Sequence, residues 1–181
     1  MEALLLAYTL SGAAGIRSSW VMLIVAVSAH FGRLHPPASL EWVGSWWLIV
    51  LALCASILDF FGDKIPALDH ALHAVHLALA PIAGGLAAAS GYHGDPVVEV
   101  IIAAIGGGNA FVVHSARTGL RAVSSATTLG IANPLISILE DVAAGALILA
   151  AFLIPVLTSL VLVLATIWTT KKVYRLVKVV G

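Results

Sequence analysis

Charged side chains are scarce in this chain. Only 10% of its 181 residues are charged, whereas 61% are hydrophobic. A soluble domain is typically about a quarter charged and about half apolar. So few polar side chains cannot cover the surface of a water-soluble protein of this size, and the composition therefore predicts a surface that faces lipid.

Cysteine and an excess of one charge are also lacking. Cys54 is the only cysteine, which excludes an intramolecular disulfide and any metal centre built from several cysteines. The formal net charge is zero, so the composition offers no electrostatic argument for binding nucleic acid. Because the first residues of the chain lack a basic segment, we expect no cleavable signal peptide.

Long apolar runs dominate the rest of the sequence. The clearest cover residues 20–31, 42–61, 97–113 and 142–168. A helix needs about 20 apolar residues to cross a bilayer, and helices satisfy their own backbone groups where lipid offers no hydrogen-bond partner. The sequence therefore predicts an all-α, polytopic transmembrane helical bundle of about six helices, formed by a single domain over residues 1–181.

The expected helices follow from these runs and from proline and glycine positions. They cover about residues 12–31, 42–60, 66–90 and 96–114, and two more lie within 134–168 and meet near Pro155. One long kinked helix over 134–168 is the alternative. Asp95 and Pro96 suit the N-cap and first position of a helix. The polar residues 115–133 are expected to form a cytoplasmic loop or a segment that dips back into the protein.

The distribution of basic residues predicts the topology. With six spans, the outside faces hold only Arg33, and the inside faces hold Lys64, Arg117, Arg121, Lys171, Lys172, Arg175 and Lys178. This asymmetry satisfies the positive-inside rule. We therefore expect a multi-pass protein of the bacterial inner (plasma) membrane, with both chain ends in the cytoplasm and a basic tail over residues 171–181.

Two pairs of short motifs suggest an internal duplication. The Gly-Ile-Arg motif ending at Arg17 is similar to the Gly-Leu-Arg motif ending at Arg121. A Ser-Ile-Leu motif precedes both Asp59 and Glu140. Two three-helix repeats, over residues 1–91 and 95–170, would be inverted relative to each other, as in many transporters. Short matches also arise by chance in apolar sequence, so coincidence is the alternative.

Ionisable residues inside a membrane are costly and therefore mark candidate functional positions. If their helix continues, Asp59 and Asp63 share one face, because they lie four residues apart. The predicted pathway for an ion or substrate comprises Arg17, Asp59, Asp63, Lys64, Asp69, His114, Arg117, Arg121, Glu140 and Asp141. The alternative for these residues is a structural ion pair or a helix end that reaches the lipid headgroups.

Two acids begin the long apolar run near the C-terminus. Glu140 and Asp141 lie at or below the membrane boundary, because apolar residues follow them at once. Arg17 and Arg121 are their natural partners, since a buried network of arginine and carboxylate groups keeps such charges satisfied. The network can be structural or can line a path.

Three residues have a spacing that would suit a metal ion. Asp69, His73 and His76 lie at positions i, i+4 and i+7 of one helical face, and His and carboxylate ligands suit zinc or another divalent metal. Such a site would need a further ligand from another element, such as His30 or His114. The alternative is a polar stripe that faces neighbouring helices. Apart from this candidate metal, no cofactor is expected.

Three glycines interrupt one of the expected helices. Gly106, Gly107 and Gly108 weaken a helix, so their presence needs a reason. Small residues allow helices to pack closely, which is the expectation here. The alternative is an unwound segment that exposes backbone groups to a solute.

Several of these motifs together resemble a known family. They are the segment from Ser11 to Arg17, the segment from Asp63 to Asp69, Pro81 with Gly84, the three glycines followed by His114, and Ser137 with Glu140 and Asp141. In this combination, which extends over nearly the whole chain, the sequence resembles a bacterial membrane family named domain of unknown function 4126. The chain has Ala80 where that family often has arginine, and His73 where an acid is common. The resemblance implies a membrane protein and implies no particular activity.

The polar residues and glycines favour a small transporter or channel for an ion or small polar solute, with the charged cluster lining or gating the path. One alternative is a membrane enzyme that acts on a lipid or isoprenoid substrate, and another is a structural or assembly partner in a membrane complex. A role other than catalysis is favoured. The expected partners are the lipid bilayer, the transported solute and a second copy of the chain in a homodimer, without nucleic acid.

Overall fold

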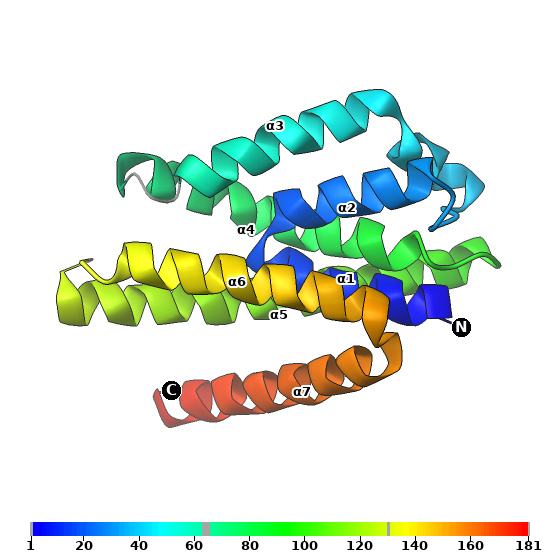
Figure 1. The fold of residues 1–181 in the computed structure, drawn as a ribbon. Coiled ribbons are helices and arrows are strands. Elements are labelled where there is room, and N and C mark those ends of the chain that lie inside the picture. Colours follow the sequence, from blue (N-terminus) through cyan, green and yellow to red (C-terminus); the bar gives the residue numbers. More distant parts are fainter. Residues whose placement is uncertain (1, 63–65, 130, 181) are drawn as a thin grey trace.

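The structure, a computed structural model, describes residues 2–62, 66–129 and 131–180, and for residues 2, 66–71, 73, 173 and 176–180 it describes the backbone alone. All regular structure in these ranges is helical (Figure 1). In chain order the elements are α1 (Glu2–Ile16), α2 (Ser18–His30), the 3-10 helix η1 (Ala38–Gly44), α3 (Trp46–Gly62), α4 (Pro66–Ala89), α5 (Pro96–Thr128), α6 (Asn133–Leu153) and α7 (Pro155–Val180). The predicted all-α bundle is confirmed.

Two of the described helices are long and apolar enough to cross a membrane. They are α5, with 33 residues, and α6, with 21 residues. The pair formed by η1 and α3, bent by 58°, passes the same test when it is taken together. The described chain therefore has two candidate spans, or three with the bent pair. This result supports a membrane protein, but the predicted count of six spans is not confirmed.

The first helix runs beside α5 in the same direction. Near the start of α1, Ala3 and Ala7 lie against Gly91, which shortly precedes α5. Near its end, Gly15 lies against Ala110 in the middle of α5. The end of α1 therefore lies deep between the other helices.

The second helix returns in the opposite direction along α3. Ser19 at its start contacts Asp59 near the end of α3, and His30 at its end contacts Trp46 at the start of α3. Helices α1 and α2 thus form a hairpin whose tip is Arg17 and whose two ends lie at one end of the bundle (Figure 1). With 15 and 13 residues, neither helix reaches the roughly 20 residues of a typical span.

The hairpin corrects the prediction of a single helix over residues 12–31. The backbone of Arg17 leaves the helical region, with φ −138° and ψ 86°. Ser18 and Ser19 follow it, and serine favours helix starts over helix interiors because its hydroxyl competes for backbone hydrogen bonds. An apolar run therefore contains a reversal that its hydrophobicity does not reveal.

Helices α4 and α5 make the most extensive contact in the bundle. The two helices pack closely at Gly84 and Gly106, where a Cβ atom on Gly106 would lie 2.6 Å from the Gly84 carbonyl oxygen. Only residues without side chains allow backbones to approach so closely. Because α5 continues through this point without a break, the three glycines do not mark an unwound segment. Gly106 and Gly107 lie against α4 and serve helix packing, as expected, whereas a Cβ atom on Gly108 would meet nothing within 4 Å.

Helix α5 also extends far beyond His114, where its end was expected. The polar residues 115–128 continue the helix, so the predicted loop over 115–133 is wrong. His114, Arg117, Arg121 and Ser124 recur at helical spacing and are all buried. Arg117 and Arg121 on this buried face pair with Glu140 of α6. The helix ends at Leu129, which has a left-handed backbone with φ 55°.

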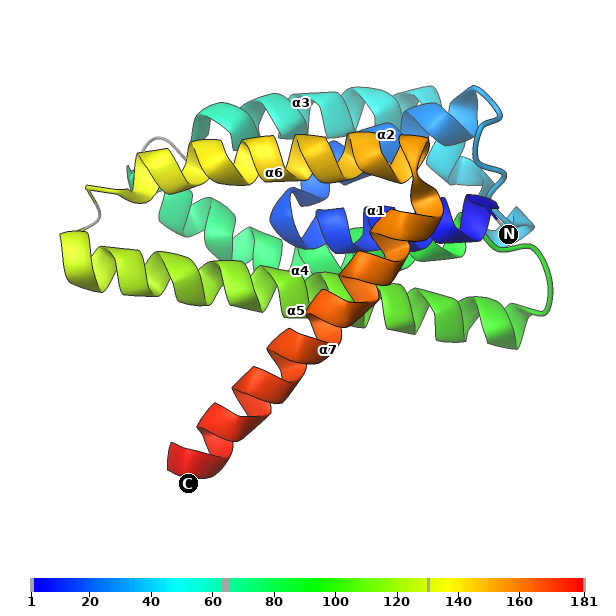
Figure 2. The same ribbon diagram turned by 60° about the horizontal axis from the view of Figure 1, so that its bottom comes forward.

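The break near Pro155 is confirmed. Helix α6 ends at Leu153, Ile154 has φ −141° and ψ 62°, and α7 begins at Pro155. Proline has no N–H to donate and disfavours helical geometry in the residue before it. Beyond this break, α7 diverges from the other helices, as Figure 2 shows.

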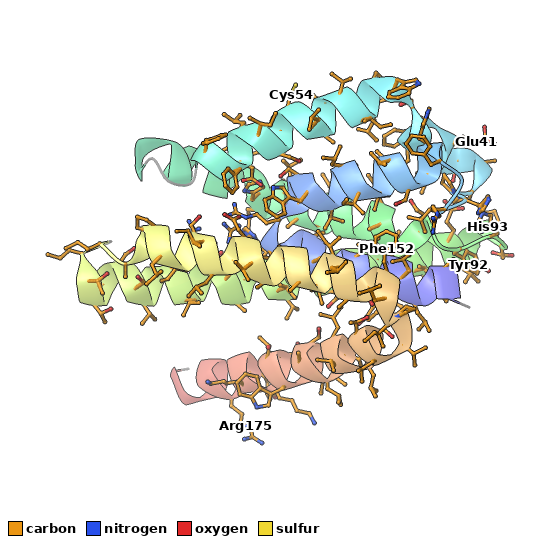
Figure 3. The ribbon with its side chains drawn as sticks, viewed as in Figure 1. Glu41, Cys54, Tyr92, His93, Phe152 and Arg175 are labelled. Carbon is orange, nitrogen blue, oxygen red and sulfur yellow. The ribbon has the colours of Figure 1, made fainter. Side chains whose placement is uncertain are left out.

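The two ends of the described chain lie at opposite ends of the bundle. The N-terminal end of α1 lies beside the α6–α7 junction, and α7 runs from there toward the other end (Figure 1). Glu41, Tyr92 and His93 lie at the first end, whereas Arg175 lies on the part of α7 that points to the second (Figure 3). The side of the membrane that each chain end faces stays a prediction.

The internal duplication is not confirmed by the directions of the helices. Helices α1 and α5, which carry the first motif pair, run in the same direction, whereas α3 and α6, which carry the second, run in opposite directions (Figure 1). A single two-fold axis cannot relate both pairs. The two motifs before Asp59 and Glu140 nevertheless bring their acids to one cluster in the bundle.

Candidate functional site

Arg17, at the tip of the hairpin, has no exposed surface. Its N–H donates to the Ala13 carbonyl at 2.9 Å, and its own carbonyl accepts from the Val21 N–H at 3.1 Å. These bonds complete the last turn of α1 and begin the first turn of α2. Although the chain reverses there, the backbone of Arg17 is satisfied, and its long side chain extends toward the neighbouring helices.

The Arg17 guanidinium joins the hairpin to α3 and α6. Its Nη1 lies 3.6 Å from Oδ1 of Asp59 on α3, and its Nη2 lies 2.5 Å from Oδ1 of Asp141 on α6. Nη2 also donates to Ser137 Oγ at 3.2 Å. The side chains of both acids are at least nine-tenths buried. One buried cation thus connects three parts of the bundle.

Asp59 has further partners on two other helices. Ser19 Oγ donates to its Oδ2 at 2.6 Å, and His76 Nε2 on α4 lies 3.4 Å from its Oδ1. Ser19 belongs to the first turn of α2, where the helix dipole favours a negative charge. We call Arg17, Asp59, Asp141 and these neighbours the hairpin-tip group.

A second group of charges lies between α5 and α6. Glu140 on α6 accepts hydrogen bonds from Arg121 Nε at 3.1 Å and from Arg121 Nη2 at 2.6 Å. Arg117, one turn earlier on α5, has its Nε 2.9 Å from Glu140 Oε2. One carboxylate is therefore shared by two guanidinium groups. We call these three residues the α5–α6 group.

The two groups balance each other in charge. The α5–α6 group contains two arginines and one acid, whereas Arg17 in the hairpin-tip group is paired with two acids. The six charged side chains sum to zero when His76 is neutral. Because burying an unpaired charge is strongly unfavourable, we infer that the balance is a property of the whole cluster. Glu140 and Asp141 are consecutive, so α6 links the two groups.

His114 is a further buried titratable residue beside this cluster. It lies three residues before Arg117 on the buried face of α5, and it is 1% exposed. Its role in a pathway stays a prediction.

The structure brings together six of the ten predicted pathway residues by direct ion pairs and places His114 on the same face of α5. The sequence predicts Arg17 and Arg121 as partners of the two adjacent acids, and the structure pairs Arg17 with Asp141 and Arg121 with Glu140. Asp63 and Lys64 lie outside the described residues, and the side chain of Asp69 does too. Any role of these three therefore stays a prediction.

The predicted metal site is only partly described. Among the described side chains, no group of three His, Cys, Asp or Glu residues is placed to hold a metal ion. The side chains of Asp69 and His73 are not among those described, so the divalent metal stays a prediction. His76, the third member, lies against Asp59.

Two serines of the cluster were not predicted as site residues, and His76 was predicted only as a metal ligand. Ser19 and Ser137 supply hydroxyl groups to Asp59 and Arg17, and His76 approaches Asp59. A signal was present in the sequence for the serines. Ser19 follows Arg17 within an apolar run, and Ser137 lies one turn before Asp141 on the same face of a helix.

Two apolar grooves flank the cluster and open on the outside of the bundle. One, of about 390 Å³, lies between α5 and α6 and includes Arg117 and Glu140 in its lining. The other, of about 290 Å³, is lined by α2, α3 and α4 and includes Ser18 and Ser19. Both grooves are therefore lined mainly by apolar side chains and include polar residues at or beside the cluster.

The fold and the cluster together define a class of protein, a helical bundle with helices apolar enough to span a membrane and with six paired charged residues buried inside it. Residues 4–175 match the model of the family described as Domain of unknown function (DUF4126), so the chain belongs to this family. The resemblance inferred from the motifs is thereby confirmed. Comparison with curated proteins finds no match, and comparison with solved structures finds none either.

Proposed function

We propose that the protein is a small membrane transporter or channel for an ion or small polar solute, in which the hairpin-tip group gates the path. The observation that supports this proposal is the position of Arg17, a buried cation at the tip of a helical hairpin, held by acids from two other helices. Ionisable residues inside membrane bundles are characteristic of ion and substrate pathways. Discontinuous helices are also characteristic of transporter binding sites.

The ion pairs suggest how such a gate works. With Arg17 bound to Asp59 and Asp141, the hairpin tip is held against α3 and α6, and the path is closed. A cation or proton that reaches either carboxylate competes with the guanidinium, because each carboxylate carries a single negative charge. When one of these two ion pairs is weakened, the hairpin tip is released from the helix that carries that acid, α3 or α6. The solute and the Arg17 guanidinium then compete for the same carboxylates, those of Asp59 and Asp141, so the path is closed when Arg17 occupies them.

The ends of the bundle also support an orientation. The end toward which α7 points carries the exposed residues Lys171, Lys172 and Arg175, and the opposite end carries Arg33 together with Glu41, Asp95 and Glu99. By the positive-inside rule the first end faces the cytoplasm. We therefore propose that the C-terminus is cytoplasmic, as expected, and that the N-terminus is on the outside of a bacterial inner membrane.

Flux through purified protein tests the proposal. We would reconstitute the wild type and Asp141→Asn into liposomes and measure movement of protons, Na⁺, K⁺ and Cl⁻ with internal dyes, and of small uncharged solutes by osmotic swelling. We expect wild-type flux above that of protein-free liposomes for at least one solute, and at least a tenfold change in Asp141→Asn, since one charged hydrogen bond contributes about 1.5–3 kcal/mol. Flux at the protein-free level across the panel would refute the proposal.

A matched control separates the gate from general effects of charge. Glu41 is an exposed acid at the other end of the bundle, so Glu41→Gln removes one negative charge without touching the cluster. Its flux should equal that of the wild type. If both variants change flux equally, surface charge and not the hairpin-tip group controls the rate.

An assembly partner is the second candidate, and α7 favours it. The helix diverges from the bundle (Figure 2) and exposes large apolar side chains, among them Leu157, Val161, Leu164 and Trp168. This function predicts that the wild type shows no flux and that Asp141→Asn lowers the yield of folded protein. It also predicts that cross-links from α7 reach another chain, including a second copy in a homodimer.

The enzyme alternative stays a prediction, in which Glu140 at the α5–α6 groove would be the acid–base group.

A further inference from the structure

The groove between α5 and α6 combines apolar walls with a charged floor. Its walls include Val113, Leu120, Ile136 and Leu139, and its floor includes Arg117 and Glu140. Leu120 and Leu139 are 57% and 60% exposed, so the groove opens on the side of the bundle where lipid would lie. The volume of about 390 Å³ falls in the ordinary range for small-molecule sites.

The floor of this groove has a surplus of positive charge. Arg117 and Arg121 share the single carboxylate of Glu140. Arg121 binds both carboxylate oxygens, whereas Arg117 reaches one of them through its Nε. Within the described part of the chain, Arg117 has no other hydrogen-bond or ion-pair partner, although it is only 8% exposed. Its terminal amino groups are therefore available to a ligand in the groove.

We propose that this groove binds an anionic phospholipid of the surrounding bilayer, with the phosphate on Arg117 and an acyl chain along the apolar walls. A guanidinium presents two parallel N–H groups that match the oxygens of a phosphate. The lipid phosphate would lie beside the α5–α6 group, which by itself contains two arginines and one acid. This site is separate from the proposed gate at Arg17 and does not depend on whether the protein transports anything.

Two features favour a lipid over a free phosphate ion. The walls are formed almost entirely by aliphatic side chains, which a small inorganic ion would leave exposed to water or lipid and which an acyl chain covers. The groove is lined by the second half of α5 and the first half of α6. These helix segments lie in the half of the bundle toward which the C-terminal end of α7 points (Figure 1). On the proposed orientation this is the cytoplasmic half, where anionic lipids are concentrated.

Lipid binding to the purified full chain tests the proposal. In a neutral detergent, native mass spectrometry would compare phosphatidylglycerol with phosphatidylcholine. We expect the wild type to prefer phosphatidylglycerol by about tenfold, the effect of one charge-assisted hydrogen bond. Arg117→Gln should lose the preference, and Arg117→Lys should retain part of it. A preference that persists unchanged in folded Arg117→Gln would overturn the proposal.

A second variant keeps the test decisive if Arg117→Gln does not fold. Ala143 is exposed and lines the groove, whereas Ala146 on the same helix is exposed and does not line it. Ala143→Phe should fill the groove and reduce binding of both lipids, and Ala146→Phe should bind as the wild type does. Equal binding by these two variants would place the lipid elsewhere.

Two further comparisons identify the source of the preference. Lys171→Gln removes an exposed positive charge from α7 and should leave the lipid preference intact. Inorganic phosphate, added at concentrations well above that of the lipid, should not displace phosphatidylglycerol. If phosphate does displace it, the groove is a site for free anions and the proposed lipid site is wrong.

Discussion

The Nη2 atom of Arg17 lies 2.5 Å from Oδ1 of Asp141, and the same nitrogen donates to Ser137, one turn earlier on α6. The hairpin tip is thus bound to the first turns of α6 by both a charged and a neutral acceptor. Asp59 holds the other side of the guanidinium at 3.6 Å. Arg17 is therefore the residue through which α1, α2, α3 and α6 depend on one another.

Replacing Arg17 should destabilise the whole bundle. Arg17→Gln leaves the buried carboxylates of Asp59 and Asp141 without their cation, and breaking a buried ion pair typically costs about 3–5 kcal/mol. We expect a large fall in the thermal unfolding temperature of the protein in detergent. Arg33→Gln is the control, because Arg33 is exposed, and surface changes are usually within about 0.5 kcal/mol. Similar stability of the two variants would show that Arg17 does not organise the bundle.

The two acids beside Arg17 should contribute unequally. Asp141 is closer to the guanidinium than Asp59 is, 2.5 Å against 3.6 Å. Asp59 also has Ser19 and His76 as partners. A double-mutant cycle between Arg17→Gln and Asp141→Asn should therefore give a larger coupling energy than one with Asp59→Asn, within the range of about 0.5–3 kcal/mol found for contacting residues. Equal coupling, measured by unfolding in detergent, would contradict this order.

The two glycines Gly106 and Gly108 should respond differently to the same change. A Cβ atom on Gly106 would collide with Ala88 and lie 2.6 Å from the Gly84 carbonyl, whereas one on Gly108 would meet nothing within 4 Å. We expect Gly106→Ala to destabilise the protein by about 1–3 kcal/mol through overpacking. Gly108→Ala should be neutral or stabilising by up to about 1 kcal/mol, because alanine favours the helix. Thermal unfolding of both variants in one detergent decides between these outcomes.

A polar bridge should hold α7 to the bundle. Asn109 Nδ2 donates to Ser11 Oγ at 3.0 Å, and Thr166 Oγ1 donates to Asn109 Oδ1 at 2.8 Å. Asn109→Leu removes both bonds, each worth about 0.6–1.7 kcal/mol between membrane helices. We expect faster hydrogen exchange in α7 and little change in α4.

The control for this change is Thr170→Val. Thr170 donates only within its own helix, to the carbonyl of Thr166, so its loss should leave α7 in place. If Asn109→Leu and Thr170→Val show the same exchange in α7, the bridge through Asn109 does not anchor that helix.

The proposed orientation can be tested by labelling single cysteines. Cys54 is exposed, so Cys54→Ser provides a background without thiols. On that background, a thiol reagent that cannot cross membranes should label His93→Cys in intact cells. It should label Arg175→Cys only after the membrane has been permeabilised. Labelling of both positions from the same side would place the two ends of the bundle in one compartment and refute the orientation.

Features set by local chemistry were predictable from the sequence. Asp95 caps α5 by accepting a hydrogen bond from the Val97 N–H at 2.7 Å, and α7 begins at Pro155. Proline and capping residues act on the turn in which they lie, so one sequence is enough to place them. The sequence also predicts Arg17 and Arg121 as partners of Glu140 and Asp141, because few partners exist for charges in so apolar a chain.

The reversal at Arg17 was not predictable in the same way. Hydrophobicity indicates only whether a side chain prefers an apolar environment or water. The residues before and after the reversal both prefer an apolar environment, so the two helices of the hairpin have the same hydrophobicity as one continuous helix. The extension of α5 was missed for the opposite reason. Arg117, Arg121 and Ser124 are polar but buried, and a polar face that meets other polar residues resembles a loop when only composition is considered.

The hairpin also constrains the order in which the protein can be made. Ser137, through which Arg17 contacts the first turn of α6, follows Arg17 by 120 residues. At about 5–20 residues per second, synthesis of that interval takes roughly 6 to 24 seconds. A lone arginine inside a membrane costs at least about 2.5 kcal/mol. We therefore expect the first two helices to remain near the membrane surface, or beside the insertion machinery, until α6 emerges and the hairpin can take its place.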